Sequence, residues 1–352
     1  MSEIGRYIYG VVGSNAGMRL FVPMESVEKT GTDLVYTIPY RDISAVVCDL
    51  PVVECACLHR DALARLLVRH QKVLERIMAL EHTVIPMRLG TFAQEDSHVE
   101  DVLRKGYPLI KDVFKKAAGK IEIDVAVTWS DFTAVLNEIG KREEISRYKQ
   151  IALSNPGGVT VEDQMKIGVM VKKALDERRE GHSSRLVACL SGLSEDFRAG
   201  ERMDDKMVMN CAFLVDKTKR KDFDNEVEGL NAEFNEKLKF RCIGPLPPYS
   251  FYTLEIKKIN FEQVIWAQKR FGLNDVTTEE EIKKAHHALS LSAHPDKNSG
   301  IQSKEGEFDE ITKAHKILIE YYRACMQEGH IDRCFFDEKD FNKNAVLVKI
   351  KD

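Results

Sequence analysis

The sequence of 352 residues lacks several features that would assign it to a well-defined class of protein. No apolar run reaches the roughly 18 residues that a membrane-spanning helix requires. The opening residues, MSEIGRYIYGVVG, do not show the basic stretch and long apolar core of a secretory signal peptide. There is no long basic block, and 52 basic residues are balanced by 56 acidic ones. We therefore expect a cytoplasmic protein whose main partner is neither a membrane nor a nucleic acid.

The sequence also has little that suggests catalysis. It has no glycine-rich phosphate loop, and acidic pairs such as Asp204 and Asp205 have no matching base in a recognisable arrangement. Cys55, Cys57 and His59 offer only three clustered metal ligands, and no second cysteine pair has zinc-site spacing. The eight cysteines are expected to be free thiols. These observations predict a protein that is not an enzyme and holds no cofactor or metal.

What is present is an alternation of strand-like and helix-like segments, which predicts an α+β fold. Single helical patterns separate the strands, and ferredoxin-like units are the nearest simple architecture. The strands are expected at 7–12, 34–39, 43–50, 83–90, 121–130, 207–215, 238–244 and 345–350. The helices are expected at 59–81, 97–118, 131–153, 160 to 178 or beyond, 220–238, 262–271, 278–293 and 304–320.

The final third of the chain has a different pattern, with several helices in succession. The helix predicted at 278–293 starts after Thr277 or Thr278 and carries three glutamates in its first turn, where acidic groups suit the helix dipole. Pro295 ends it within the tripeptide His294-Pro295-Asp296. The next helix presents an apolar face that can pack against the first, which predicts an antiparallel hairpin with an exposed connection.

This segment resembles the J domain of DnaJ-type co-chaperones. The matching pieces are FGLNDVTTEEEIKKA, HPDKN and FDEITKAHKIL. The resemblance implies that His294, Pro295 and Asp296 dock on a DnaK-type ATPase, with Lys283 and Lys284 as basic contacts. Basic and aromatic residues that are usual before the tripeptide are replaced here by residues such as His286 and His287. We therefore expect weaker electrostatic steering and sensitivity to pH, or a hairpin that only packs.

The first 258 residues resemble the GvpF/GvpL family of gas vesicle proteins. The motifs that carry the resemblance are HQKVLERIMALEHTVIPMRLGT, IEIDVAVTW, NCAFLVDKTKRKDFDNEVEGLN and GPLPPYSF. Leu246 stands where that family usually has tryptophan, and Leu89 where phenylalanine is common. Both exchanges keep the positions apolar. The resemblance implies an accessory or minor component of gas vesicles, which are shells built from a small apolar protein.

Together the two resemblances imply two ferredoxin-like-type α+β domains, residues 1–118 and 119–258, followed by a small all-α J-domain-like helical module, residues 259–328. A tail, 329–352, ends in a short strand. The expected function is gas vesicle assembly, with the shell protein or other accessory proteins as partners and a DnaK-type chaperone as a further partner. The alternative is a minor structural component of the vesicle wall whose helical module only packs.

Three further features have structural interpretations. His70 lies on the apolar face of its predicted helix, which is typical of a core or interface histidine. Arg88 follows a short strand and is expected to make an interdomain ion pair, with binding of a partner as the alternative. The segment NAVLVKIKD is expected to add as a strand to a sheet edge within the same chain, with a sheet edge on a partner as the alternative.

Overall fold

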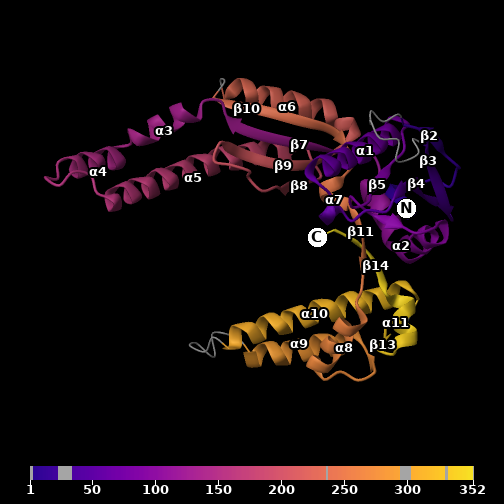
Figure 1. Cartoon of the computed structure of the whole chain (residues 1–352). Helices are drawn as coiled ribbons and strands as arrows, with labels where there is room; N and C mark the ends of the chain where they lie inside the picture. The colour runs from indigo at the N-terminus through magenta and orange to yellow at the C-terminus, as the bar shows by residue number, and fades with distance from the viewer. Residues whose placement is uncertain (1–2, 23–33, 235–236, 294–302, 330–331, 352) are drawn as a thin grey trace. The chain divides into compact units, whose positions relative to one another are not determined.

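The computed structural model describes residues 3–22, 34–234, 237–293, 303–329 and 332–351 (Figure 1). The chain divides into two compact units. The first combines Met1–Lys116 with Tyr252–Asp352, and the second is Ala117–Phe251. The first unit therefore brings together parts of the chain that lie far apart in the sequence.

The N-terminal part of the first unit is an antiparallel sheet with two helices. Its strands are β1 (Ile4–Val12), β2 (Arg19–Phe21), β3 (Leu34–Tyr40), β4 (Ile43–Pro51), β5 (Val84–Pro86) and β6 (Phe92–Ala93). The strand order is β2-β3-β4-β1-β5, and β6 also pairs with β1. The short helix η1 (Cys55–Cys57) precedes α1 (Arg60–Ala79), and α2 (Asp96–Ala117) follows β6.

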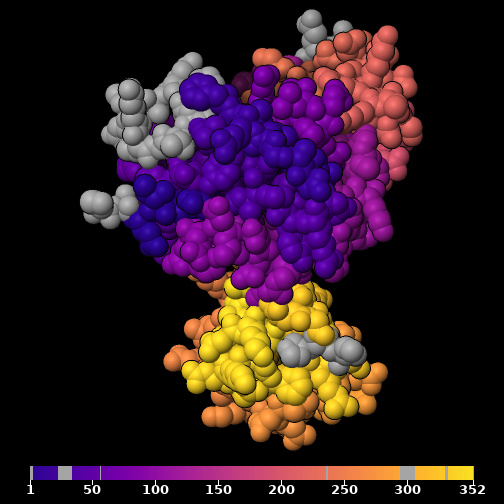
Figure 2. Space-filling view, turned by 90° about the vertical axis from the view of Figure 1, so that its right-hand side faces the viewer, coloured from indigo at the N-terminus to yellow at the C-terminus, as the bar shows by residue number. Residues whose placement is uncertain are grey.

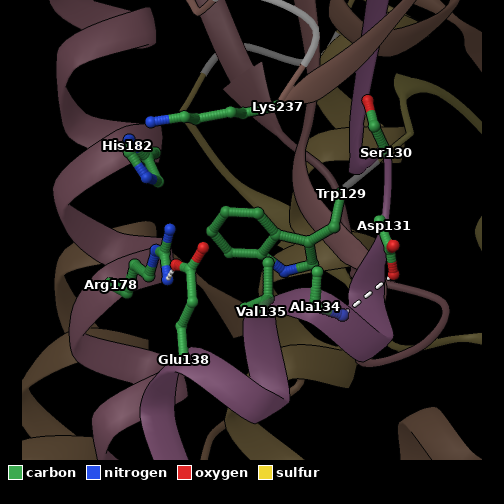
Figure 3. A pocket seen from close by; sticks show the side chains of 9 residues that line it. All are labelled: Trp129, Ser130, Asp131, Ala134, Val135, Glu138, Arg178, His182 and Lys237. Carbon is green, nitrogen blue, oxygen red and sulfur yellow. Dashed lines mark hydrogen bonds and ion pairs between the residues drawn. The ribbon is translucent and has the colours of Figure 1, made fainter. Parts of the chain in front are cut away.

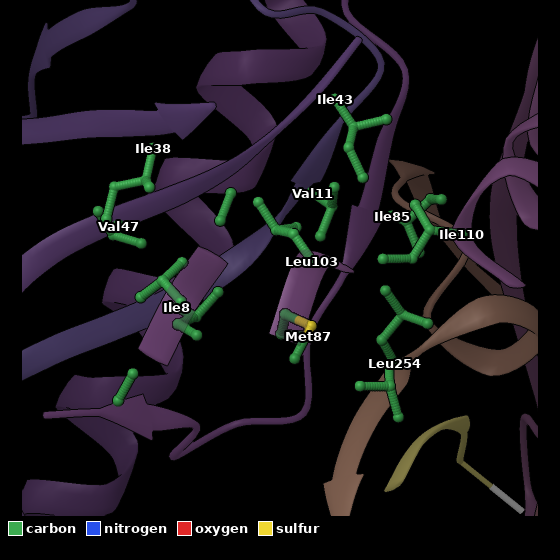
Figure 4. Close-up of a cluster of buried hydrophobic side chains, with 14 of the residues drawn as sticks. Ile8, Val11, Ile38, Ile43, Val47, Ile85, Met87, Leu103, Ile110 and Leu254 are labelled. Atoms are coloured by element: carbon green, nitrogen blue, oxygen red, sulfur yellow. The ribbon is translucent and has the colours of Figure 1, made fainter. Parts of the chain in front are cut away.

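The core of this sheet is built from β-branched and leucine side chains (Figure 4). Ile8 and Val11 of β1, Val47 of β4 and Leu103 of α2 are almost fully buried in one cluster. Ile8 and Val11 are three residues apart, and an irregularity in the pairing of β1 with β4 between Ile8 and Gly10 lets both enter the same cluster as Val47 and Leu103. The same cluster contains Leu254, a residue that comes after the second unit in the sequence.

A two-stranded sheet outside the N-terminal domain joins the helical module to that core. Strand β11 (Leu254–Lys258) pairs with β14 (Val346–Ile350) in antiparallel register. Leu254 and Val348 are both buried in the N-terminal cluster, and the backbone N–H of Arg88 donates to the carbonyl oxygen of Leu254 at 2.8 Å. A Cβ at Gly106 of α2 would lie 2.8 Å from Val348 Cγ1, so glycine there permits the close approach.

The rest of the first unit is a helical module between these two strands. It contains α8 (Phe261–Phe271), α9 (Glu279–Ala293), α10 (Ser303–Gln327) and α11 (Glu338–Asn344), with a small β12 (Val276–Thr277) and β13 (Cys334–Phe335) pair. Helix α10 packs against both α8 and α9, and the three lie side by side in Figure 1. Ile282, Ile311, Leu318 and Tyr321 form its fully buried centre. The module is a packed helical body, shown in orange and yellow in Figure 2.

The second unit has the strand order of a ferredoxin-like sheet. Its elements are β7 (Lys120–Trp129), α3 (Phe132–Gly140), α4 (Glu143–Leu153), α5 (Val161–Ser191), β8 (Asp196–Ala199), β9 (Met207–Asp216), η2 (Lys217–Lys219), α6 (Arg220–Glu233), β10 (Leu238–Leu246) and α7 (Tyr249–Tyr252). The sheet order is β10-β7-β9-β8, with every pair antiparallel. This is the fourth-first-third-second order of a β-α-β-β-α-β unit, with α3 to α5 in place of its first helix.

The α+β class and the helical C-terminal module are confirmed. The second sheet has the expected ferredoxin-like order, whereas in the first sheet four strands precede the first long helix. The predicted tail strand is confirmed as β14, docked within the chain. The helical patterns at 131–153 form two helices, α3 and α4. Strands β2, β6, β8, β11, β12 and β13 were not predicted. No described helix is both long and apolar enough to cross a membrane.

Replacing Leu254 by alanine should destabilise the first unit by about 2–5 kcal/mol, because it leaves a cavity where a fully buried leucine joins two parts of the core. Equilibrium urea unfolding measures this loss, and hydrogen exchange at the β14 amides should accelerate. The exposed Lys258 of the same strand provides the control. Lys258→Ala should change stability by less than about 0.5 kcal/mol. Equal effects of the two substitutions would contradict the proposed anchoring.

Candidate functional site

Helix α9, which carries the predicted basic contacts, starts at a capping box. Thr278 Oγ1 accepts a hydrogen bond from the backbone N–H of Glu281, and the Glu281 carboxylate accepts one from the backbone N–H of Thr278 at 2.9 Å. These reciprocal bonds lower the pKa of the Glu281 carboxyl. They fix where the helix starts, and hence which later side chains face the core and which face solvent. Of the two predicted capping residues, Thr278 is the one used.

Lys283 and Lys284 both lie on the exposed surface of α9. Their side chains are 61% and 80% exposed. Lys283 Nζ lies 2.7 Å from a carboxylate oxygen of Glu279, and Lys284 Nζ lies 3.9 Å from one of Glu280. Exposed ion pairs between residues four apart on a helix stabilise the fold by only about 0.3–0.5 kcal/mol. The two lysines can therefore exchange these partners for a carboxylate on another protein at little cost.

The tripeptide predicted to contact the chaperone, His294, Pro295 and Asp296, lies outside the described residues, which stop at Ala293 and resume at Ser303. What is described is the pair of helices on either side. Ala293 is 1% exposed and belongs to the core of the module. The helix hairpin expected from the sequence is present as α9 and α10.

Two histidines stack between α9 and α10. The rings of His286 and His315 are 3.9 Å apart between centroids and 15° from parallel, and Phe271 of α8 stacks on the other side of His286. Burial lowers the pKa of both imidazoles. The neighbouring His287 lowers the pKa of His286 further, and His286 and Lys283 lower that of His315. His315 Nε2 is buried with no hydrogen-bond partner among the described residues. The hairpin thus contains two imidazole rings, of His286 and His315, whose surroundings favour their neutral form.

Acidification should loosen this hairpin. Because the folded pKa values of His286 and His315 lie below the usual 6.5, the unfolded state binds more protons, and stability is lost as the pH falls below that value. Hydrogen exchange of the α9 and α10 segments should therefore be faster at about pH 5.5 than at about pH 7.5. The variant His315→Phe keeps a stacked ring but removes one titrating group, so it should reduce this difference.

His287→Gln is the matched control, because His287 is exposed on the same helix and lies outside the stack. This variant should keep most of the acid sensitivity. If His287→Gln removed the pH dependence and His315→Phe left it intact, the stack would not be its source.

A partly buried cluster of charges joins α2 to Glu328, the residue that follows α10. The Glu328 carboxylate lies 2.9 Å from Arg104 Nη1 and 2.8 Å from Lys105 Nζ, and Lys105 also donates to the carbonyl oxygen of Lys343. Burial raises the pKa of Glu328, but the hydrogen bonds from Arg104 and Lys105 outweigh it, so the net pKa is lowered. These contacts supplement the β11–β14 pairing in holding the helical module on the N-terminal domain.

Other residues singled out from the sequence have structural positions. His70 is 3% exposed, and its Nδ1 lies 2.8 Å from Tyr7 Oη, so the prediction of a core histidine is confirmed. Burial lowers its pKa to about 4. Arg88 makes an ion pair with Glu255 of β11. The described residues contain no group of three or more His, Cys, Asp or Glu side chains placed to hold a metal ion.

The second unit contains a pocket at the end of β7, between α3 and α5 (Figure 3). Its volume is about 190 Å³. The lining residues are Trp129, Ser130, Asp131, Ala134, Val135, Glu138, Arg178, His182 and Lys237. The indole of Trp129 is 5% exposed, the guanidinium of Arg178 lies 5.5 Å from its ring centroid, and Arg178 pairs with Glu138 at 2.8 Å. The pocket combines an apolar floor with a rim of mixed charge, in which Arg178 and Lys237 lie near Asp131 and Glu138.

Strand β7 also carries a pair of carboxyls, the buried Glu122 and the half-buried Asp124. Glu122 of β7 is 1% exposed, and its two oxygens accept hydrogen bonds from the backbone N–H and the hydroxyl of Ser250, each at 2.8 Å. Asp124, two residues along the same strand, faces the same side. Burial raises the pKa of both carboxyls, and a hydrogen bond to Asp124 favours the protonated form of Glu122. The pair fastens the GPLPPYSF segment to the sheet.

The second unit should therefore be more stable in mild acid than in base. With a folded pKa raised above its unfolded value, Glu122 keeps a proton in the folded state that the unfolded chain releases, so stability declines as the pH rises. In Glu122→Gln this decline should be smaller, because the amide resembles the protonated carboxyl. Urea unfolding from about pH 5 to about pH 9, followed by Trp129 fluorescence in a Trp266→Phe background, measures it.

Glu228→Gln, an exposed substitution on α6, should keep the wild-type pH profile. A Glu122→Gln profile as steep as that of the wild type would show that this carboxyl is ionised in the folded state.

Sequence reasoning missed the pocket and the Glu328 cluster. Trp129 lies in β7, Arg178 in α5 and Lys237 just before β10, and they share no spacing that a motif could reveal. The same holds for Arg104, Lys105 and Glu328, which are separated by more than 200 residues. For His286 and His315 a signal did exist, because both lie on the facing sides of two helices that were predicted to pack.

Comparison with known proteins agrees with this architecture. The DnaJ domain model matches residues 269–324, so the helical module is a J domain. The gas vesicle synthesis protein GvpL/GvpF model matches residues 5–253. The chain therefore combines a gas vesicle protein region with a DnaJ domain.

Individual relatives carry gas vesicle names. Gas vesicle protein F of Nostoc is 27% identical over 189 residues, covering 53% of this chain and 77% of that protein. Gas vesicle protein F1 of Halobacterium salinarum is 25% identical over 252 residues, covering 71% and 93%. The crystal structure of gas vesicle protein GvpF from Anabaena shares the fold at a TM-score of 0.59 and 23% identity, covering 72% of this chain and 99% of that one. The chain belongs to the gas vesicle synthesis protein GvpL/GvpF family.

Proposed function

We propose that this chain is a gas vesicle assembly factor, not an enzyme, that acts in the cytoplasm and on gas vesicles. Its GvpL/GvpF region binds the shell protein or other accessory gas vesicle proteins, and its J domain recruits a DnaK-type chaperone. In this proposal residues 1–118 and 119–258 are the two domains of that region. Residues 259–328 present the chaperone contacts, and the tail 329–352 supplies the clamping strand.

The observation that carries the proposal is the way the J domain is attached. Strands on both sides of it, β11 and β14, pair with each other, and both contribute side chains to the N-terminal core. Glu328 adds a partly buried ion pair to α2. A gas vesicle protein bound to the N-terminal domain would thus be held close to the J domain, which suits delivery of an apolar client to an ATP-driven chaperone. Aggregation-prone apolar surface before assembly is the physical need that such delivery meets.

The proposed chaperone contacts are His294, Pro295 and Asp296, with Lys283 and Lys284 on α9. A carboxylate such as Asp296 is a suitable partner for an arginine on the ATPase, because charge-assisted bidentate pairs are strong and directional. The two lysines would add attraction to an acidic surface, limited by their pairs with Glu279 and Glu280.

The full-length chain should stimulate ATP hydrolysis by a DnaK-type chaperone, and Asp296→Asn should lower that stimulation at least about tenfold, because it leaves a charged partner unpaired. Single-turnover ATPase rates measure it. Asp309→Asn, an equal charge change at an exposed position of α10, is the control and should retain wild-type stimulation.

A wild-type chain that never stimulates any such ATPase would remove the recruitment role. Co-purification of the full chain with the shell protein would then decide what remains. A stable, stoichiometric presence in finished vesicles would support a minor wall component whose J domain only packs.

A further inference from the structure

The pocket beside Trp129 lies wholly within the unit Ala117–Phe251 and takes no part in the J-domain role. At about 190 Å³ it is smaller than the roughly 300–1,000 Å³ that small-molecule sites occupy. A space of this size holds about one large side chain. Its size therefore favours a single residue of a partner protein over a cofactor or metabolite.

The floor of the pocket is apolar. The Trp129 ring lies among Ala134 and Val135 of α3, and the side chains of Arg178, His182 and Lys237 stand on its other side (Figure 3). The ring of His182 meets the indole edge-to-face at a centroid distance of 5.4 Å. An aromatic or aliphatic side chain entering the pocket would find aromatic surface to pack on.

The rim carries charges of both signs, because Asp131 and Glu138 line the pocket together with Arg178 and Lys237. The Asp131 carboxylate accepts a hydrogen bond from the backbone N–H of Ala134, and the cations gather on the side of His182. Arg178 is paired with Glu138, and the nearby Arg185 is paired with Glu233 at 2.5 Å. Lys237, in contrast, has no ion-pair partner within the described part of the chain, and its side chain is exposed. Burial lowers the pKa of His182, and Arg178, Arg185 and Lys237 lower it further, which shows that these charges converge there. That side of the rim suits a carboxylate.

We propose that this pocket binds an acidic peptide segment of a partner protein. One apolar or aromatic side chain of the segment enters over Trp129, and flanking carboxylates pair with Lys237 and Arg178. Protein is favoured over nucleic acid because the chain has a net charge of −4 and no extended basic surface to follow a phosphate backbone. The pocket would give the second unit its own recognition site.

The chain offers a direct optical test, because it has only two tryptophans, Trp129 and Trp266. In the full-length Trp266→Phe variant, all indole fluorescence reports on the pocket. The probe is the peptide acetyl-Asp-Glu-Phe-Asp-Glu-amide. It should change Trp129 fluorescence along a saturable curve with a midpoint below about 1 mM, and added salt should weaken it.

Two further peptides test the charged and the apolar contacts separately. Replacing the acids by Asn and Gln removes the ion pairs with Lys237 and Arg178, and should weaken binding at least about tenfold. Replacing the Phe by Ala removes the side chain that packs on Trp129, and should also weaken binding at least about tenfold. Equal binding of all three peptides would overturn the proposal. Tighter binding of a single-stranded oligonucleotide than of the acidic peptide would also overturn it, since the rim would then bind phosphate groups in preference to carboxylates.

Lys237→Glu should weaken binding of the acidic peptide at least about tenfold by reversing the unpaired charge. Lys239→Glu is the matched control: it is exposed, lies two residues along the chain and does not line the pocket. It should bind within about twofold of the parent. Both positions are exposed, so both variants should fold, which circular dichroism checks. Unchanged affinity in Lys237→Glu, or equal losses in the two variants, would exclude this pocket as the site.

Discussion

The pairing of β11 with β14 is the contact on which the organisation of the first unit depends. Five residue pairs join strands that are separated by the whole helical module, and Leu254 and Val348 bury their side chains in the N-terminal core. The ion pairs of Glu328 with Arg104 and Lys105 join the same two parts. The helical module and the N-terminal sheet therefore belong to one compact unit, although they are far apart in the sequence.

Charge reinforces the same junction. Glu320 of α10 lies 2.6 Å from Lys257 Nζ of β11 and 3.9 Å from Lys349 Nζ of β14, and Glu328 meets Arg104 and Lys105 of α2. Truncating one partner of a buried pair is costly because the other charge remains buried. The exposed ion pairs on α9 differ from these, since they contribute little to the stability of the fold and their lysines can pair with carboxylates of another protein instead. The chain thus places durable ion pairs where the module is attached and weak ones where a partner is expected.

The sequence predicted the parts of the fold that depend on local periodicity. The long helices, the hairpin of β3 and β4, the central strands β7 and β9 and the α9–α10 hairpin all have clear spacing of apolar residues. Strand β11 was missed because its sequence, LEIKK, is short and half charged, and it is stabilised by a partner 92 residues away. Of the predicted site, Lys283 and Lys284 are exposed on α9 as expected. The Trp129 pocket could not be predicted, because tertiary packing alone brings its residues together.

The order of the elements has a consequence for how the protein is made. Strand β14 follows helices α8 to α11 in the sequence, so it is synthesised after the helices that its pairing with β11 attaches to the N-terminal sheet. The core of the helical module includes Cys334, Phe336 and Phe341, which directly precede β14, so the module and its closing strand are completed together. Synthesis of the last residues of the described chain therefore finishes the module's core and attaches the module to the N-terminal sheet in one step.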